Sequence, residues 1–254
     1  MPRFFITESD IKETDGGIYV RITGDDAAHI TKALRMKTGE ILTLCDMKGI
    51  EYETRITETG ENVFAEVISS KKSENEPPYK CAVYQSLVKG DRFDTVLQKS
   101  TELGASDIIP VITSRCTVKL EKSDYARKTE RWQKIVNEAS KQCGRAAIPK
   151  VHLPISFREA VEEAKKSDLS LFCYEGNGTK PISYYIKEEN APKSISVMIG
   201  PEGGYSVDEA EYASLSGMKM TGLGKRILRT ETAPIYVLSC ISMSYELSCG
   251  FNQD

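Results

Sequence analysis

Histidine is scarce in this sequence, and the cysteines lack the spacing of a metal site. Only two histidines, His29 and His152, occur among 254 residues, and they lie far apart in the chain. Because zinc sites need clustered histidine or cysteine ligands, we expect no metal. The seven cysteines form no CxxC pair and follow no regular spacing, which favours reduced, mostly buried thiols of a cytosolic protein; they are Cys45, Cys81, Cys116, Cys143, Cys173, Cys240 and Cys249.

The sequence also lacks long apolar runs and a strong net charge. No run approaches the roughly 20 apolar residues of a membrane span, and the start, MPRFFITESD, does not resemble a signal peptide. We therefore expect a cytoplasmic protein with no membrane partner. The net charge of -3 gives no global attraction to nucleic acid. Any binding of RNA or DNA must then depend on local basic patches.

A glycine-rich stretch, IGPEGGYS, follows an apolar run at Ser196–Ile199. Glycine-rich turns after a strand usually bring backbone N–H groups close to a ligand, often a phosphate. This stretch has neither the lysine of a P-loop nor the GxGxxG of a dinucleotide fold. Glu202, in the middle of the loop, would repel a phosphate. The loop therefore favours a ligand that is not strongly anionic.

The residues before about position 70 predict a small β-barrel with one helix. Four short segments alternate in hydrophobicity and are punctuated by turn residues. A helix is expected over residues 25–39, with Asp25 as its cap and Ile30 and Leu34 as an apolar pair. The polar stretch SSKKSENEPP, at Ser69–Pro78, predicts a linker, which we place at residues 71–78. The expected strands are Gly17–Thr23, Glu40–Asp46, Ile50–Thr57 and Asn62–Ser69.

The residues from 79 onward predict an α/β domain built on a parallel sheet. Strand-like segments alternate with helical patterns. Two helix starts carry S-x-x-E capping boxes, at Ser156/Glu159 and Ser206/Glu209. In such sheets ligands bind at the carboxyl ends of the strands. The expected strands are Cys81–Leu87, Ile108–Ile112, Leu169–Tyr174, Ser194–Ile199 and Met218–Leu223.

A second loop, GLGKRILRTETA at Gly222–Ala233, follows the last of these strands. Thr232 is expected to cap a final helix over Ala233–Leu247, with Pro234 in its first turn. That helix is apolar on nearly all faces, so we expect it to be buried, with part of it at a subunit interface. Either loop alone fits an ordinary turn between strand and helix. Two such loops at adjacent strand ends, each with a carboxylate, favour a ligand site.

These loops also carry a family resemblance. IGPEGGYSVDE and LGKRILRTETA resemble motifs of the ribosomal RNA small-subunit uridine-N3 methyltransferases, which belong to the SPOUT superfamily. MPRFF, HITKALRMKTG, LQKSTELG and KQCGR match further family motifs in the expected order, so the resemblance covers nearly the whole chain. Tyr205 and Lys141 stand where the family commonly has other residues, but neither departure touches the glycines.

The resemblance implies a fold, a cofactor and partners. It implies a PUA-like barrel at residues 1–70 that binds RNA. It further implies a SPOUT domain at residues 79–254, with a deep trefoil knot near residues 196–240. Members of the family are homodimers that use S-adenosylmethionine to methylate N3 of a uridine in 16S ribosomal RNA, in the small ribosomal subunit. The cofactor's sulfonium is cationic and carries no phosphate, which agrees with the missing P-loop lysine.

The resemblance also implies which residues form the site. Backbone groups of three loops would hold the cofactor, and small residues permit their close approach. The expected cofactor-binding residues are Tyr174, Glu175, Ile199, Gly200, Glu202, Gly203, Leu223, Gly224, Ile227, Leu228, Thr230, Thr232 and Ala233.

Methylation of uracil N3 requires loss of a proton whose pKa lies well above neutral. The reaction needs a general base, or a cation that stabilises the anionic ring. Glu231 and Glu202 are the candidate bases, and Arg229 is the candidate cation. A purely structural role of Glu202 in shaping its loop, or an ion pair of Arg229 with a carboxylate, is the alternative for each.

RNA contacts must come from local cations, because the net charge is negative. Lys32 and Arg35 are expected on one helix face. Arg35 and Arg145 rank highest because they lie inside family motifs, although most such residues are ordinary solvated charges. The expected RNA-binding residues are Arg3, Lys32, Arg35, Lys99, Arg115 and Arg145.

Two other functions stay open at this point. One is another SPOUT methyltransferase with a different target nucleotide or atom. The other is an RNA-binding ribosome assembly factor without turnover, which the intact glycines, Arg229 and Glu231 disfavour. A nicotinamide or nucleoside-triphosphate enzyme lacks its glycine fingerprint.

Overall fold

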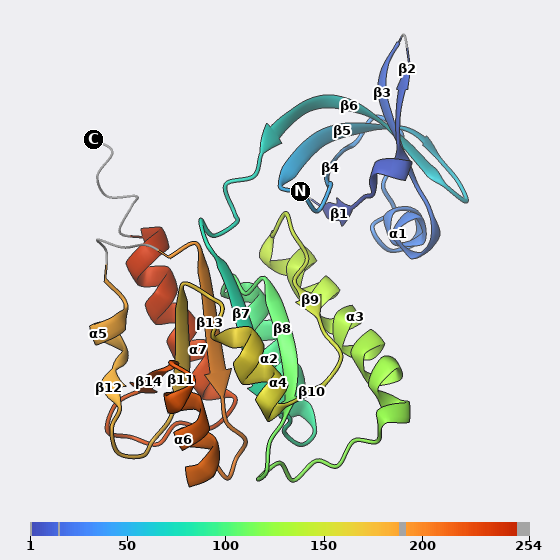
Figure 1. Ribbon diagram of the computed structural model, residues 1–254. Coiled ribbons are helices and arrows are strands. Elements are labelled where there is room, and N and C mark those ends of the chain that lie inside the picture. Colours follow the sequence, from blue (N-terminus) through green and yellow to red (C-terminus); the bar gives the residue numbers. More distant parts are fainter. Residues whose placement is uncertain (1, 15, 188–191, 248–254) are drawn as a thin grey trace. The chain divides into compact units, whose positions relative to one another are not determined.

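The computed structural model describes residues 2–14, 16–187 and 192–247. The chain forms two compact units, Met1–Glu76 with Ser140–Ile148, and Pro77–Ala139 with Pro149–Asp254 (Figure 1). The described residues contain no helix that is long and apolar enough to cross a membrane.

The first unit is a six-stranded sheet in the order β1-β4-β5-β6-β3-β2. Only β1 and β4 pair in parallel. The expected strands are present, with β5 and β6 longer than predicted and strongly curved (Figure 1). Register shifts in their pairing are β-bulges, which bend a strand. The strands are β1 (Arg3–Phe5), β2 (Ile11–Thr14), β3 (Gly17–Ile22), β4 (Ile41–Cys45), β5 (Ile50–Thr59) and β6 (Val63–Lys72); β1 and β2 were not predicted.

Two predictions for this unit were wrong. The expected helix over residues 25–39 is a short α1 (Gly24–Ala28) that continues as a π-helical turn, His29–Ala33. Thr23, not Asp25, precedes the helix, and Leu34 is 42% exposed while Ile30 is fully buried, so the two do not form one apolar face. The expected linker also starts too early, because β6 continues to Lys72. Alternating polar side chains on an exposed strand are easily mistaken for a linker.

The second unit is an eight-stranded parallel sheet in the order β10-β8-β7-β13-β11-β14-β12, with β9 paired to β8. All five predicted strands are confirmed to within one or two residues at either end. β9, β10 and β12 are two residues long and carry no periodic signal. The strands are β7 (Lys80–Ser86), β8 (Asp107–Ile112), β9 (Lys150–Val151), β10 (Ile155–Ser156), β11 (Leu169–Cys173), β12 (Lys180–Pro181), β13 (Ser194–Ile199) and β14 (Lys219–Gly222).

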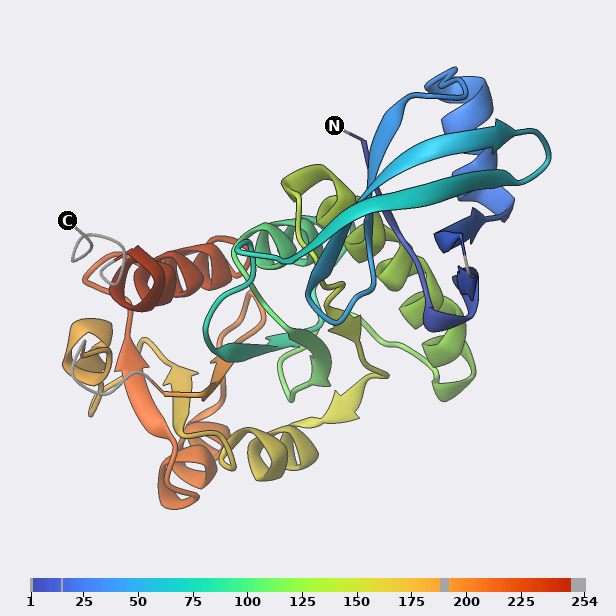
Figure 2. The same ribbon diagram turned by 90° about the horizontal axis from the view of Figure 1, so that it is seen from above.

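Helices cover both faces of this sheet. Figure 2 shows α2 (Asp91–Glu102) and α7 (Thr232–Ser242) on one face, and α4 (Phe157–Ala164) and α6 (Val207–Leu215) on the other. The second face packs Phe157, Phe172 and Tyr205 into one apolar cluster. Both predicted capping boxes are confirmed at the starts of α4 and α6. The remaining helices are α3 (Tyr125–Cys143) and the single turn α5 (Ile182–Tyr185).

The predicted final helix is present, but it is buried on one face and not on nearly all faces. α7 continues as a π-helical turn, Met243–Leu247. Val237, Leu238 and Ile241 are buried. The cap was assigned wrongly: Thr232 is the first helical residue, and Glu231 precedes it without a side-chain cap.

Candidate functional site

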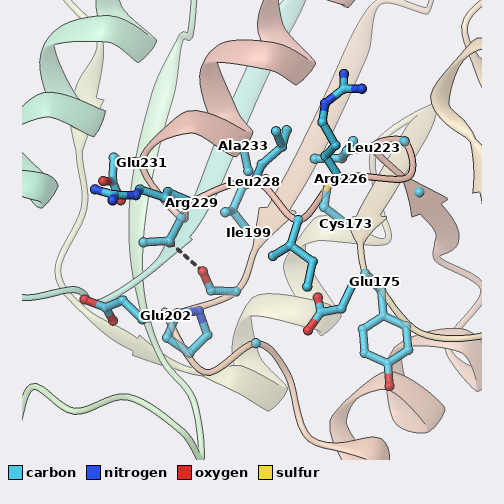
Figure 3. Close-up of a pocket in the computed structure, with 18 of the residues that line it drawn as sticks. Cys173, Glu175, Ile199, Glu202, Leu223, Arg226, Leu228, Arg229, Glu231 and Ala233 are labelled. Atoms are coloured by element: carbon cyan, nitrogen blue, oxygen red, sulfur yellow. Dashed lines mark hydrogen bonds between the residues drawn. The ribbon is translucent and has the colours of Figure 1, made fainter.

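The carboxyl ends of four neighbouring strands, β7, β13, β11 and β14, meet at one edge of the second sheet. The segments that follow β13, β11 and β14, together with the start of α2, enclose a cavity of about 430 Å³. This volume lies in the range of about 300–1,000 Å³ that is typical of small-molecule sites. Figure 3 shows the cavity with Leu228 and Ala233 on one side and Glu175 and Glu202 on the other.

Most of the predicted cofactor and catalytic residues line this cavity. They come from the ends of β11 and β13 and from the loop between β14 and α7, segments far apart in the sequence. The predicted residues that line it are Tyr174, Glu175, Ile199, Gly200, Glu202, Leu223, Gly224, Ile227, Leu228, Arg229, Thr230, Glu231 and Ala233.

Two predicted residues, Gly203 and Thr232, do not line the cavity. Thr232 has become the first residue of α7. A Cβ on Gly203 would lie 3.5 Å from Cβ of Arg115, which is ordinary contact. The adjacent Gly204 lines the cavity and is the glycine with positive φ, at 64°. A loop with consecutive glycines does not reveal which of them takes the left-handed conformation.

Other lining residues were not among the predicted cofactor-binding or catalytic residues. Arg92 enters from the first turn of α2, because β7 lies beside β13 in the sheet. The order of strands cannot be read from periodicity, so no signal tied Arg92 to the glycine loop. Burial raises the pKa of the Cys173 thiol, which disfavours a thiolate nucleophile there. The lining residues not predicted are Arg92, Cys173, Thr179, Pro201, Gly204, Gly222, Lys225 and Arg226.

Four charged side chains in the cavity differ in their partners. Arg92 forms an ion pair with Glu202, with Nη1 3.0 Å from Oε1. Glu202 therefore also supports the loop, as the structural alternative proposed. In the described part of the chain, Arg229 and Glu231 form no ion pair, and Oε2 of Glu231 is buried without a hydrogen-bond partner. A buried carboxylate oxygen without a partner is costly and often marks a functional site.

Several predicted RNA contacts instead form intramolecular ion pairs. Arg3 donates to Glu51 at 2.8 Å, and both side chains are at least 85% buried. Arg145 is 5% exposed and binds Glu76, which also accepts from the backbone N–H groups of Ala146 and Ala147. The prediction that Arg3 and Arg145 face RNA was therefore wrong, because a motif can hold a cation for internal pairing.

The other predicted RNA contacts are at least partly exposed. Lys99 pairs with Glu102 on its own helix, and Arg115 donates to the carbonyl of Gly203 at 2.9 Å. Lys32 and Arg35 are exposed, but Arg35 lies beyond the helix, with φ 56°. The two therefore do not share a helix face as predicted.

The cysteines in the described residues are free thiols. Cys45, Cys81 and Cys173 are buried, and Cys116, Cys143 and Cys240 are partly buried. Cys249 lies outside the described residues. No group of histidine, cysteine or acidic side chains that could hold a metal ion occurs in the described ranges.

The two adjacent glycines of the loop after β13 give a matched pair of substitutions. We expect Gly204→Ala to lower the free energy of unfolding, whereas Gly203→Ala should be close to neutral. A Cβ on Gly204 would lie 2.4 Å from Oε1 of Glu175, and an L-residue in the left-handed region costs about 1–2 kcal/mol. Chemical denaturation of both variants measures the difference, and equal stabilities would contradict the assignment of the strained position.

Known proteins share both the sequence and the fold of this chain. Residues 75–242 match the family model described as an RNA methyltransferase domain, and residues 22–68 match an RNA methyltransferase PUA domain. Ribosomal RNA small subunit methyltransferase E of Bacillus subtilis is 34% identical over 257 aligned residues, covering 98% of this chain and 99% of the relative.

Two solved structures agree with this match. The Neisseria gonorrhoeae ribosomal RNA small subunit methyltransferase E bound to S-adenosyl methionine is 34% identical, with a TM-score of 0.83 over 96% of this chain and 97% of that one. A methyltransferase from Legionella pneumophila in complex with its cofactor SAM is also 34% identical, with a TM-score of 0.82 over 95% and 96% of the two chains. These matches confirm the resemblance seen in the glycine loops: the chain belongs to the ribosomal RNA small subunit methyltransferase E family.

Proposed function

We propose that this protein transfers the methyl group of S-adenosylmethionine to N3 of a uridine in 16S ribosomal RNA. The observation that carries the proposal is the cavity at the carboxyl ends of β11, β13 and β14, which collects most of the residues that the family motifs point to. Relatives with 34% identity are named ribosomal RNA small subunit methyltransferase E or are methyltransferases with S-adenosylmethionine bound in their structures.

The cavity suits this cofactor chemically. Its glycines let a flat ring approach the backbone, and Gly224 has a φ of 108° that disfavours any side chain. The carboxylates of Glu175, Glu202 and Glu231 line the cavity and can stabilise the cationic sulfonium of the cofactor. Bound there, the cofactor supplies an electrophilic methyl group on a sulfonium. The protein must position the uracil of the RNA next to that methyl group and remove the N3 proton.

We assign the proton removal to Glu231 and the charge stabilisation to Arg229. Both side chains line the cavity, and neither forms an ion pair within the described residues. Glu202 is less suited as the base, because it is already paired with Arg92. A general base needs a free lone pair: Oε2 of Glu231 has no hydrogen-bond partner, whereas Oε1 of Glu202 is occupied by the Arg92 guanidinium.

A trefoil knot and a homodimer complete the proposal. After β14, near one edge of the sheet, the chain returns to place α7 against β13 and α2, a path that supports a knot near residues 196–240.

Along α7 and the turn after it, Tyr236, Met243 and Leu247 are 41%, 65% and 58% exposed, respectively. These exposed apolar side chains lie on a helix whose other face is buried, and such an apolar surface supports an interface between two copies.

RNA binding is assigned to the cavity mouth and to the first unit. Lys225 and Arg226 line the cavity, are exposed, and form no ion pair among the residues described. With Arg229 they place three cations in five residues, where the phosphates of the target nucleotide would pass. Of the RNA contacts predicted in the first unit, Lys32 and Arg35 are the exposed ones.

The central test is methyl transfer from tritiated S-adenosylmethionine to small ribosomal subunits, and in parallel to free RNA, from a strain that lacks this protein. We expect label at N3 of one uridine, located by mass mapping. Label on another atom or nucleotide would favour a methyltransferase with a different target. Binding of RNA and cofactor without any transfer would favour the assembly factor.

The pH dependence of the methyl-transfer rate distinguishes the role of Glu231 from that of Arg229. Glu231→Gln should keep cofactor affinity and slow single-turnover transfer about 10²- to 10⁴-fold, the usual contribution of a general base. Its deficit should shrink as pH rises, since more uracil is then already deprotonated. Arg229→Lys should also slow transfer, but its deficit should persist at high pH because the anion still needs a planar cation. A Glu231→Gln enzyme as fast as wild type at neutral pH would exclude that base.

The assignment of Lys225 and Arg226 to the RNA surface predicts how RNA affinity depends on salt concentration. Lys225→Gln and Arg226→Gln should each weaken RNA binding and lower the slope of log affinity against log salt by about 0.7–0.9. Lys134→Gln is the control, because Lys134 is exposed but paired with Glu130 at 3.2 Å. A slope unchanged in both test variants would remove these residues from the RNA surface.

The dimer predicts a size in solution. Light scattering at micromolar concentration should give the mass of two chains, and Met243→Asp should shift it toward one chain. Stable interfaces of the obligate kind bury more than about 2,000 Å², so a charge near the centre of one should be disruptive. A monomeric wild-type protein would contradict the proposal.

A further inference from the structure

An uncharged polar side chain lies in the interior of the second unit, where an apolar one would be expected. Gln85 is the penultimate residue of β7 and is fully buried. Its Nε2 donates to Oγ1 of Thr230 at 3.0 Å and to the carbonyl of Ser86 at 3.1 Å. Burying an amide costs free energy unless it is hydrogen-bonded, so its presence here needs a reason beyond packing.

The partner of Gln85 connects it to the glycine loop. Oγ1 of Thr230 accepts from Gln85 and donates to the carbonyl oxygen of Gly200 at 2.7 Å. One hydroxyl therefore joins the end of β7, the end of β13 and the loop before α7. We call this chain of two hydrogen bonds, Gln85–Thr230–Gly200, the loop pin.

The loop pin lies between the two residues assigned to the chemistry. Arg229 and Glu231 flank Thr230, and consecutive Cα atoms are only about 3.8 Å apart. Fixing the Thr230 side chain therefore restricts the backbone that carries both. On the other side, a Cβ on Gly200 would lie 3.3 Å from the ring of Tyr205, which is itself buried, so Gly200 is held from two directions.

We propose that Gln85 is a positioning residue, which acts through Thr230 to hold Arg229, Glu231 and the Gly200 turn in the geometry that binds cofactor and supports transfer. The proposal rests on the function proposed above. Gln85 does not line the cavity, so its effect on ligands must pass through Thr230. Oε1 of Gln85 is buried without a hydrogen-bond partner, so the amide contributes through Nε2, whose bond to Thr230 restrains a loop that must be precisely placed.

Gln85→Met and Thr230→Val each remove one partner and keep the volume of the side chain. In the free protein, hydrogen exchange of the amides in residues 223–231 should quicken about 2- to 10-fold, since one hydrogen bond is lost. The affinity for S-adenosylmethionine should fall, and single-turnover transfer should slow by up to about 10²-fold at saturating cofactor and RNA. Thr230→Ser keeps the hydroxyl and should retain most of the activity.

The double variant tests the link itself. Because the two residues share one hydrogen bond, the effects of Gln85→Met and Thr230→Val should be clearly less than additive. Ser196→Ala is the control. Ser196 is fully buried on β13 and donates to the carbonyl of Ala164 at 2.7 Å, so it loses a comparable bond away from the site. The control should lose stability without change in loop exchange, cofactor affinity or transfer rate.

The outcomes separate the two proposals. Exchange in residues 223–231 that is unchanged in both single variants, or additive effects in the double variant, overturns the loop pin. Effects that the control reproduces also overturn it, since they would reflect stability alone. Faster exchange and non-additivity in a protein that methylates no ribosomal RNA would support the loop pin and contradict the proposed function.

Discussion

The position of β13 between β7 and β11 is the constraint on which the site depends. β13 comes later in the chain than either neighbour, yet it pairs with both in parallel along most of its length. Its carboxyl end is therefore surrounded by the ends of β7, β11 and β14. The glycine turn at that point therefore contacts side chains from Arg92 to Thr230, which are far apart in the sequence.

The central position explains the composition of the turn. Gly200 leaves room for the ring of Tyr205, and Gly204 leaves room for Glu175, which comes from the neighbouring strand end. The sheet also brings Arg92 to Glu202 from the start of α2. Close approach from three directions selects residues without a Cβ, so the glycines reflect crowding around the turn as much as access for a ligand.

The basic side chains of this protein fall into two groups, those that form internal ion pairs and those that remain exposed at the cavity. Arg3 and Arg145 sit in sequence motifs, but they hold carboxylates inside the first unit, where each fixes strands or loops that are distant in sequence. The loop before α7 keeps its cations exposed instead. A family motif records that a residue is required, and only its partners show whether the requirement is structural or concerns a ligand.

The sequence predicted the parts of the fold that depend on local rules. Five parallel strands, two capping boxes and the presence of the final helix follow from hydrophobic periodicity and from side chains that satisfy helix N–H groups. The family motifs predicted most of the cavity. The helix predicted over residues 25–39 was too long. Its apolar spacing continues from Ile30 to Leu34, but the structure buries Ile30 and leaves Leu34 exposed. The role of Arg92 and the choice of Gly204 depend on strand order and backbone angles, which no local pattern encodes.

Gln85 shows how a local sequence position acquires its role from the order of the strands. On the sequence alone it is one polar residue near the end of an apolar strand, and periodicity assigns it to no class. Once β7 lies beside β13, the same amide faces a threonine 145 positions away, and that threonine separates the two residues proposed for catalysis. An apolar side chain at residue 85 would fill the space but give Thr230 no donor, so its hydroxyl would be held only by Gly200. The polar residue is thus explained by the loop it orients, because packing alone would favour its replacement.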